Sequence, residues 1–306
     1  MITDPYGRPV TSIRVSITQK CNLHCFYCHR EGEDYEKYNY TEMTPEEIEK
    51  ILRLVTSFGV GKVKLTGGEP LIRSDILKIV KRIRSLNEIS EVSMTTNGTL
   101  LNELAKPLKK AGLVRVNVSL DTLNQKTFKM ITGVDALNKV ISGIKEAVEV
   151  NLNPVKVNMV LLKGINHNEV WSMIEFAERN NIILQLIELE SAREDDFYRK
   201  YHSDMTKIEN ELTKKAEKVT VRNMHHRRKY LLPGKVEVEI VKPMHNTEFC
   251  QYCNRIRITS DGKFKPCLFR VNNLVDFLSP MRNGASTEDL KKIFIEAVKR
   301  RQPYFT

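Results

Sequence analysis

Short β-rich runs alternate with segments of helical periodicity between Ile13 and about Glu190, and this alternation restricts the chain to few folds. Strand, helix, strand repeats place successive strands parallel, with right-handed crossovers. The alternatives are therefore an open doubly wound α/β sheet and a full or partial β/α barrel. The predicted strands are residues 13–18, 62–66, 91–95, 115–120, 155–162 and 183–188.

The clearest helix start is Thr44-Pro45-Glu46-Glu47. Thr44 can cap the helix, Pro45 suits the first helical position, and Glu47 completes a capping box. The other predicted helices are residues 74–86, 100–111, 136–150 and 167–180, with a last one at about 287–301.

The periodic pattern fades between residues 191 and 235, which predicts an irregular or helical excursion. Alternating residues 236–241 then predict an edge or hairpin strand. We therefore predict two regions: residues 1–190 as the β/α unit, and residues 191–306 as a C-terminal region with the excursion and a final helix.

Charge and hydropathy limit the partners. The 306 residues carry 49 Lys and Arg against 38 Asp and Glu, a net charge of +11, which favours an anionic partner. No run approaches the roughly 18 apolar residues of a membrane span. The first residues include Asp4, Pro5 and Arg8 in place of an apolar leader. We expect a cytoplasmic protein without a membrane partner.

Three cysteines, Cys21, Cys25 and Cys28, stand within eight residues. Three thiolates on so short a loop can ligate three irons of a cubane cluster and leave the fourth iron open, because no further cysteine is near. The alternative is a structural zinc site completed by His24 or His29.

The segment Thr66-Gly67-Gly68-Glu69-Pro70 follows the second predicted strand. Two glycines let the backbone approach a ligand closely, and a neighbouring carboxylate can accept hydrogen bonds from an ammonium group. Taken alone, the segment is equally consistent with an ordinary turn.

A second group, Cys250, Cys253 and Cys267, again offers three thiolates. The Asp261-Gly262 turn between alternating runs predicts a hairpin that returns Cys267 towards the other two. Zinc is an alternative here also, with His245 as the fourth ligand.

The CX3CX2C spacing, with Tyr27 before the third cysteine, resembles the radical S-adenosylmethionine (SAM) superfamily. The resemblance implies a [4Fe-4S] cluster whose open iron binds the amino and carboxylate groups of SAM. One electron from the cluster then cleaves SAM to a 5'-deoxyadenosyl radical. The positions that match SAM contacts are Tyr27, Gly67, Gly68, Glu69 and Ser119.

From about residue 5 to residue 300 the chain resembles the molybdenum cofactor biosynthesis protein A family, the GTP 3',8-cyclases. The matching motifs are residues 4–9, 14–18, 21–28, 64–70, 95–98, 117–121, 156–158 and 249–257, with Cys267 following. The resemblance implies an incomplete (β/α)6 barrel whose C-terminal extension carries a second [4Fe-4S] cluster. It also implies lyase chemistry: the radical removes the C3' hydrogen of GTP, and C3' closes onto guanine C8. The product is (8S)-3',8-cyclo-7,8-dihydroguanosine 5'-triphosphate.

Cations suit the triphosphate, and arginine forks match phosphate oxygens. Arg255 and Arg257 share one face of a strand, because side chains repeat every two residues. The positions that match GTP contacts are Arg14, Lys64, Thr95, Lys156, Arg255, Ile256 and Arg257. The resemblance further implies an external electron donor and a cyclic pyranopterin monophosphate synthase that receives the product. We expect no nucleic-acid partner, and a homodimer stays open.

Three positions depart from the family pattern. Lys64 replaces a frequent arginine, which keeps the charge and loses the planar fork. Glu190 stands where many members place a methionine against SAM. The last residues are Pro303-Tyr304-Phe305-Thr306, whereas many members end in a Gly-Gly tail that enters the pocket.

Two other functions compete with the cyclase interpretation. A radical SAM peptide maturase would also carry an auxiliary cluster, although such enzymes usually have more C-terminal cysteines. A basic nucleic-acid-binding protein would use the run from His225 to Lys229. We interpret that run as a solvated charged surface, because no aromatic ladder accompanies it.

Overall fold

The computed structural model describes residues 1–33, 41–191 and 195–305. No helix within these ranges has the length and apolar character of a membrane span.

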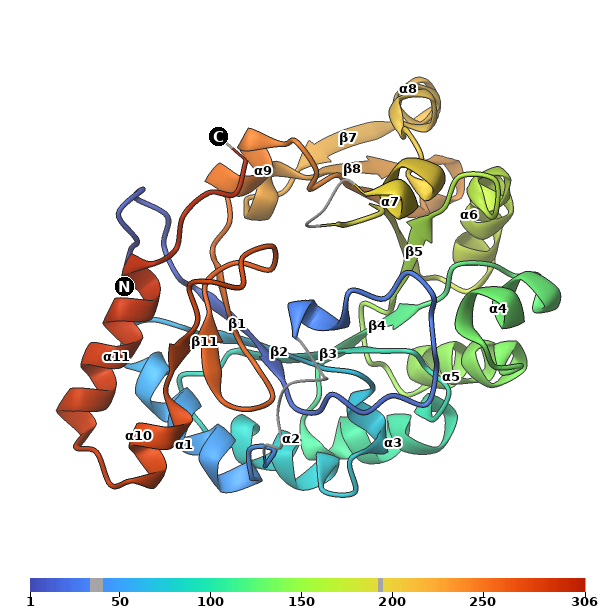
Figure 1. Ribbon diagram of the computed structural model, residues 1–306. Coiled ribbons are helices and arrows are strands. Elements are labelled where there is room, and N and C mark those ends of the chain that lie inside the picture. The colour runs from blue at the N-terminus through green and yellow to red at the C-terminus, as the bar shows by residue number, and fades with distance from the viewer. Residues whose placement is uncertain (34–40, 192–194, 306) are drawn as a thin grey trace.

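Six parallel strands form the centre of the molecule, as predicted. They lie side by side in chain order and curve around a central space (Figure 1). The sequential order identifies a barrel wall and excludes a doubly wound sheet. The strands are β1 (Ser12–Ser16), β2 (Lys62–Thr66), β3 (Glu91–Thr96), β4 (Arg115–Ser119), β5 (Lys156–Leu161) and β6 (Ile183–Glu188).

C-terminal strands extend both edges of this wall into one 12-stranded sheet. At one edge β9 (Glu237–Val241) pairs parallel with β6 and antiparallel with β8 (Arg228–Leu231), followed by β7 (Lys218–Val221). The strand predicted at residues 236–241 is thus a hairpin strand inside the sheet. At the other edge β10 (Arg255–Ile258) pairs parallel with β1.

Beyond β10 the sheet ends in β11 (Lys263–Lys265) and β12 (Val275–Asp276), both antiparallel. The β10–β11 hairpin confirms the turn predicted at Asp261-Gly262. Because β9 and β10 lie at opposite edges of the six-stranded wall, residues 242–254 connect the two ends of an incomplete barrel.

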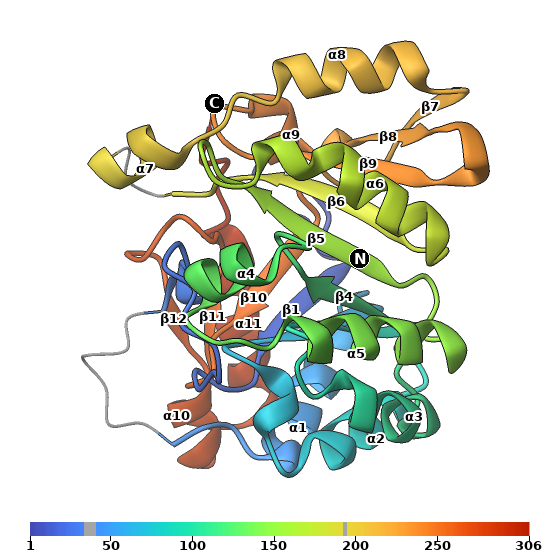
Figure 2. The ribbon, with the colours of Figure 1, turned by 90° about the vertical axis from the view of Figure 1, so that its right-hand side faces the viewer.

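Helices cover the outside of the wall (Figures 1 and 2). All the predicted helices are present: α1 (Pro45–Thr56), α2 (Ile76–Arg84), α3 (Leu101–Ala111), α5 (Leu137–Glu149), α6 (Val170–Arg179) and α11 (Thr287–Lys299). The capping box is formed, since Glu47 N donates to Thr44 Oγ1 at 3.2 Å and Thr44 N donates to Glu47 Oε2 at 2.8 Å.

Five helices were not predicted individually. These are α4 (Gln125–Thr132), α7 (Asp196–Tyr201), α8 (Thr206–Lys215), α9 (Thr247–Gln251) and α10 (Leu278–Arg282). Asn124 caps α4 by accepting from Thr127 N at 3.0 Å. The helices α7 and α8 lie in the excursion, where few apolar residues mark a buried face.

The two faces of the wall differ in chemistry. Apolar residues such as Val63, Leu65 and Met94 are buried towards the helices. The residues between them are polar and face the barrel interior, and cross-strand register aligns Arg257 with Arg14 and Arg14 with Lys64. The interior is therefore a polar cavity, unlike the packed interior of a complete barrel.

The last helix, α11, packs on the β10–β11 hairpin through Phe294. The Phe294 ring is fully buried and lies 5.1 Å from the ring centroids of Phe58 and Phe264. This aromatic contact joins α11 to the segment that follows α1 and to the β10–β11 hairpin.

Replacing Phe294 with alanine should lower the free energy of unfolding by about 4 kcal/mol, because it leaves a cavity among three rings. Denaturant unfolding followed by circular dichroism measures the change. Lys292→Ala on the exposed face of α11 is the matched control and should stay within about 0.5 kcal/mol of the parent. Equal stability of both variants would show that this contact does not hold the helix.

Candidate active site

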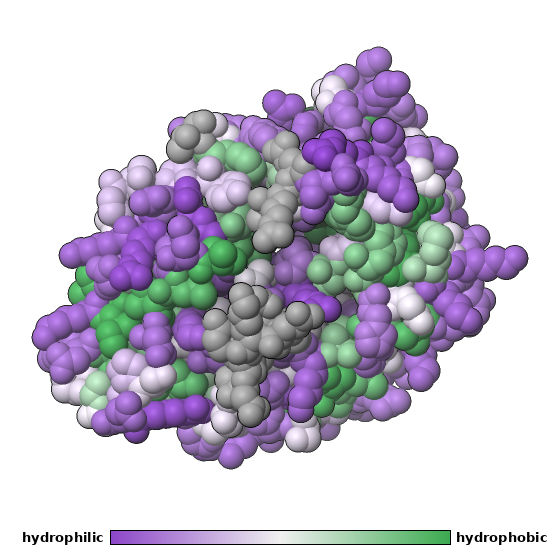
Figure 3. All heavy atoms as spheres, in the orientation of Figure 1, coloured by the Kyte–Doolittle hydropathy of each residue, from purple (hydrophilic) through white to green (hydrophobic). Residues whose placement is uncertain are grey.

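A cavity of about 390 Å³ opens at the C-terminal ends of the barrel strands, and both cysteine groups line it. In Figure 3 hydrophilic residues are visible in the central gap of the same face, between hydrophobic patches on either side. Among the described residues, eleven Lys and Arg line the cavity against four Asp and Glu. The eleven cations are Arg8, Arg14, Arg30, Lys64, Arg115, Lys156, Arg222, Arg227, Arg255, Arg257 and Arg301. Such a wall favours a highly charged anion.

Cys21, Cys25 and Cys28 lie on the loop after β1, and all three line the cavity. Backbone N–H groups of Leu23 and Arg30 each lie 3.4 Å from a cysteine sulfur, Cys21 and Cys28 respectively. Within the described ranges no three His, Cys, Asp or Glu side chains converge on a single point as a mononuclear metal site requires. A cubane gives each thiolate its own iron, so three separated sulfurs on one wall fit a cluster with one open iron.

The glycine pair of residues 67 and 68 packs directly under the cysteine loop. A Cβ on Gly68 would lie 2.1 Å from the carbonyl oxygen of Lys20 and 2.5 Å from that of Gln19. Gly67 has a φ of +148°, and a Cβ there would also clash, because it would lie 2.3 Å from the Thr18 carbonyl oxygen. Only glycine allows the loop to sit this close to β2.

Glu69, a predicted SAM contact, lies behind the cavity wall in this structure, and its role towards SAM stays a prediction. Its side chain is fully buried and is not among the described residues that line the cavity. The carboxylate accepts hydrogen bonds from Thr96 Oγ1 at 2.6 Å, Asn97 N at 2.6 Å and Leu71 N at 2.9 Å. Burial raises its pKa to about 7. In this structure Glu69 therefore orients the loop after β3, which faces the first cysteine group.

The other positions matched to SAM all line the cavity: Tyr27, Gly67, Gly68 and Ser119. The Tyr27 hydroxyl donates to Asp121 Oδ2 at 2.5 Å, and Val160 N donates to Asp121 Oδ1 at 2.8 Å. Burial raises the pKa of Asp121 to about 6, although the hydrogen bond from Tyr27 opposes the shift. Tyr27 is thereby fixed beside Cys25 and Cys28.

The second cysteine group lines the same cavity and flanks the β10–β11 hairpin, in which β10 pairs with β1. Cys250 lies on α9, Cys253 follows it, and the β10–β11 hairpin brings Cys267 to the cavity as predicted. His245, the alternative zinc ligand, is not among the described lining residues. Three thiolates facing one cavity again fit a cluster with one open iron.

A buried charge cluster holds the loop of the second cysteine group. Arg8 Nη1 donates to the Cys250 carbonyl at 2.8 Å, and Arg301 Nη2 donates to the Cys253 carbonyl at 2.6 Å. Asp4 pairs with both arginines, at 2.8 Å to Arg8 and 3.1 Å to Arg301. The contacts of Asp4 and Arg8 explain how the motif at residues 4–9 contributes to the site. Arg301 was missed, because nothing in its local sequence signals burial.

The chain end reaches the same region. Gln302 and Tyr304 line the cavity, and Phe305 N lies 3.5 Å from Cys250 Sγ. Thr306 lies outside the described residues. Residues 302–305 thus approach the second cysteine group.

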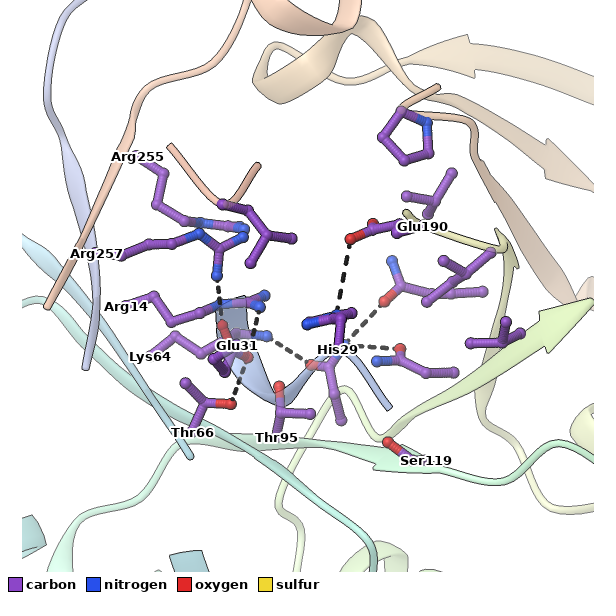
Figure 4. Close-up of a pocket in the computed structure, with 18 of the residues that line it drawn as sticks. Arg14, His29, Glu31, Lys64, Thr66, Thr95, Ser119, Glu190, Arg255 and Arg257 are labelled. Atoms are coloured by element: carbon purple, nitrogen blue, oxygen red, sulfur yellow. Dashed lines mark hydrogen bonds and ion pairs between the residues drawn. The ribbon is translucent and has the colours of Figure 1, made fainter. Parts of the chain in front are cut away.

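Glu31 is the main site residue that the sequence did not reveal. Its carboxylate accepts from Arg257 Nη1 at 2.6 Å, Arg14 Nη1 at 3.1 Å and Thr66 Oγ1 at 2.9 Å (Figure 4). Burial opposes its ionisation, but the charges of Arg14 and Arg257 outweigh burial and lower its pKa to about 2. Glu31 lies just after Cys28 with a φ of +53°, so its reach into the cavity depends on an irregular turn.

Four of the five cations matched to GTP contacts come from the neighbouring strands β10, β1 and β2. Figure 4 shows Arg255, Arg257, Arg14 and Lys64 one below another, with Thr95 at the floor and Ser119 on the far side. Glu190 and His29 lie opposite, with 3.8 Å between Oε2 and Nε2. Ile256 has its side chain fully buried and is not among the described lining residues.

A hydrogen-bonded network underlies these cations. Lys64 Nζ donates to Asn117 Oδ1 at 2.9 Å, and Asn117 Nδ2 donates to Gln185 Oε1 at 2.8 Å. Gln185 Nε2 and Lys156 Nζ both donate to the buried carboxylate of Glu239. Burial lowers the pKa of Lys156 to about 8, although Glu239 opposes the shift.

The basic run at residues 225–229 is only partly a solvated surface. His225 is buried, the Arg227 side chain is 12% exposed, and both line the cavity, which corrects our interpretation for these two residues. Arg228 is exposed and pairs with Glu209 at 3.4 Å, as a surface residue would.

Replacing Gly68 with alanine should displace the cysteine loop, because its Cβ would overlap two backbone carbonyls. We expect the reconstituted variant to lose most of its SAM affinity and part of its bound iron, measured by anaerobic equilibrium dialysis and iron analysis. Gly61→Ala is the matched control, since its Cβ would meet the Glu88 carbonyl at an ordinary 3.4 Å. Unchanged SAM affinity in Gly68→Ala would contradict the close packing assigned to this glycine.

Comparison with known families agrees with this geometry. The sequence profile of the radical SAM superfamily matches residues 15–177, and the profile described as Molybdenum Cofactor Synthesis C matches residues 182–306. The fold and the three-cysteine loop thus define a radical SAM enzyme with a [4Fe-4S] cluster and SAM as its cofactors.

Curated relatives identify the family within this superfamily. Proteins named "Probable GTP 3',8-cyclase" from Thermococcus kodakarensis and Pyrococcus horikoshii are 54% and 52% identical to this chain, and cover 100% of it. The alignments span 100% and 99% of those two proteins, and a Methanocaldococcus jannaschii relative is 49% identical over 99% of this chain. The chain belongs to the GTP 3',8-cyclase family of the radical SAM superfamily.

Solved structures support the fold alone. The structure of Streptococcus suis SuiB bound to precursor peptide SuiA has a TM-score of 0.66 at 18% identity, covering 86% of this chain and 60% of that one. The structure of native anSMEcpe with bound AdoMet has a TM-score of 0.65 at 17% identity, covering 95% of this chain and 81% of that one.

Proposed function

We propose that this chain is a GTP 3',8-cyclase that performs the first step of molybdenum cofactor biosynthesis. One observation carries the proposal: the two cysteine groups face one cavity whose wall is rich in cations. A radical formed at one group then has a triphosphate substrate held beside it. We further propose that Cys250, Cys253 and Cys267 bind a second [4Fe-4S] cluster.

Each group of residues has a distinct task. Cys21, Cys25 and Cys28 would hold the first cluster, which when bound supplies the electron that cleaves SAM. Tyr27, Gly67, Gly68 and Ser119 would position SAM above it. Orientation of SAM and substrate inside the cavity would keep the radical away from water and from other hydrogen donors.

GTP would lie between the two cysteine groups. Arg14, Lys64, Lys156, Arg255 and Arg257 would bind its phosphates, and Thr95 would contact it from the floor. The radical that SAM would supply when bound would take one hydrogen atom from ribose C3', and C3' would then form a bond to guanine C8. The resulting radical takes up one electron and one proton to give the cyclised dihydro-GTP.

Several partners are part of the same proposal. An external electron donor would reduce the clusters, and a cyclic pyranopterin monophosphate synthase would receive the product. The division into residues 1–190 and 191–306 describes the proposed roles, because the first region carries the SAM cluster and the second carries the auxiliary cysteines.

The direct test is anaerobic. The protein is reconstituted with iron and sulfide, reduced, and given SAM with and without GTP, and 5'-deoxyadenosine and nucleotide products are quantified by chromatography. We expect GTP to stimulate 5'-deoxyadenosine release and a cyclised guanosine product to accompany it. If SAM were cleaved at the same rate with and without GTP and every nucleotide stayed unchanged, the cyclase proposal would be rejected and a peptide maturase favoured.

Cysteine variants separate the two groups. Cys25→Ala should abolish 5'-deoxyadenosine formation, because the first cluster loses a ligand. Cys253→Ala should retain uncoupled SAM cleavage and lose cyclisation, with about four of eight irons lost per chain. Full cyclisation by Cys253→Ala would show that the second group is only structural, and 5'-deoxyadenosine from Cys25→Ala would remove the first cluster from the mechanism.

A further inference from the structure

The loop between β7 and β8, residues 222–227, presents two arginines to the cavity. Arg222 and Arg227 stand at its two ends, and Arg222 N donates to the Arg227 carbonyl at 2.9 Å, which closes the loop. Both side chains line the cavity. Nothing in the local sequence distinguishes these two arginines from the exposed cations around them.

This loop is held rigidly against the second cysteine group. His225 N donates to the Tyr252 carbonyl at 2.9 Å, and the His225 ring stacks on Phe249 at a centroid distance of 3.9 Å. Arg255 Nη2 lies 3.2 Å from the sulfur of Met224 at the loop tip. The loop is therefore anchored to α9, beside Cys250, and to Arg255, one of the positions that match GTP contacts.

The charge around the loop is incompletely neutralised. Glu239 accepts from Arg222 Nη1 at 3.0 Å, lies 3.7 Å from Arg227 Nη2, and is also the ion-pair partner of Lys156. A single buried carboxylate is therefore the ion-pair partner of three cations. Within the described residues the buried Nε of Arg227 has no hydrogen-bond partner. A multiply charged anion would supply the missing negative charge and acceptors.

We infer that Arg222 and Arg227 form a further phosphate-binding subsite of the GTP cavity, held in place by Glu239. The inference rests on the proposed function, since it takes GTP as the substrate. Glu239 fixes the two guanidinium groups before the ligand arrives, so that little side-chain entropy is lost on binding. Arg222 and Arg227 bind and orient the triphosphate while the ribose reacts elsewhere in the cavity.

Binding of GTP and of guanosine to the reconstituted enzyme, measured by anaerobic equilibrium dialysis, tests the subsite. We expect Arg222→Gln and Arg227→Gln each to weaken GTP binding by about tenfold or more, and to leave guanosine binding unchanged, because only GTP has phosphates. Inorganic tripolyphosphate should compete with GTP in the parent and less well in both variants. Arg227→Lys should recover part of the lost affinity, since it restores the charge without the fork.

Arg228→Gln is the matched control, because Arg228 is adjacent in sequence, exposed, and paired with Glu209 away from the cavity. It should bind GTP as the parent does. Glu239 keeps Lys156 as a partner in each single variant, so folding is expected to survive, and circular dichroism and iron content check it. Unchanged GTP affinity in both variants, or equal weakening of GTP and guanosine, would overturn the subsite. Absence of GTP conversion by the parent would instead reject the proposed function.

Discussion

The structure depends on the neutralisation of like charges that the sheet itself places side by side. Register aligns Arg257 with Arg14 and Arg14 with Lys64 across three neighbouring strands, all facing the barrel interior. Like charges opposite one another destabilise a sheet, and burial increases the cost. Glu31, on the cysteine loop, offsets this repulsion by pairing with Arg14 and Arg257, and Glu239 on β9 pairs with the cavity cations Lys156 and Arg222. The remaining positive charge makes the cavity suitable for a triphosphate.

The parallel pairing of β10 with β1 joins the two cysteine groups into one site. It brings the start of the C-terminal hairpin next to the strand that leads into the first cysteine loop. Asp4, Arg8 and Arg301 then fix the second loop from both ends of the chain. Family motifs that are far apart in sequence are thus parts of a single wall.

Sequence periodicity predicted the fold well, because each strand of the wall has a buried apolar face and each outer helix a matching one. The barrel was still one of two options until cross-strand order was known, since local patterns do not specify which strands pair. The helix α4 was missed because it is short and its apolar face is small.

Sequence motifs identified cavity-lining residues where the motif is local, and missed those that reach the cavity only through tertiary contacts. The six cysteines, Gly67 and Gly68 belong to short motifs that can be recognised in the sequence, and all of them line the cavity. Glu31 and Arg227 look like surface charges, and only tertiary contacts reveal their burial. Glu69 and Ile256 belong to matched motifs, yet they support the wall from behind.

The central claim is that SAM-derived chemistry acts on GTP inside the shared cavity. The most direct measurement uses GTP carrying deuterium at C3', with mass spectrometry of the 5'-deoxyadenosine formed under anaerobic turnover. The account predicts one deuterium atom in 5'-deoxyadenosine for each cyclised nucleotide. Cyclised product accompanied by unlabelled 5'-deoxyadenosine would contradict it.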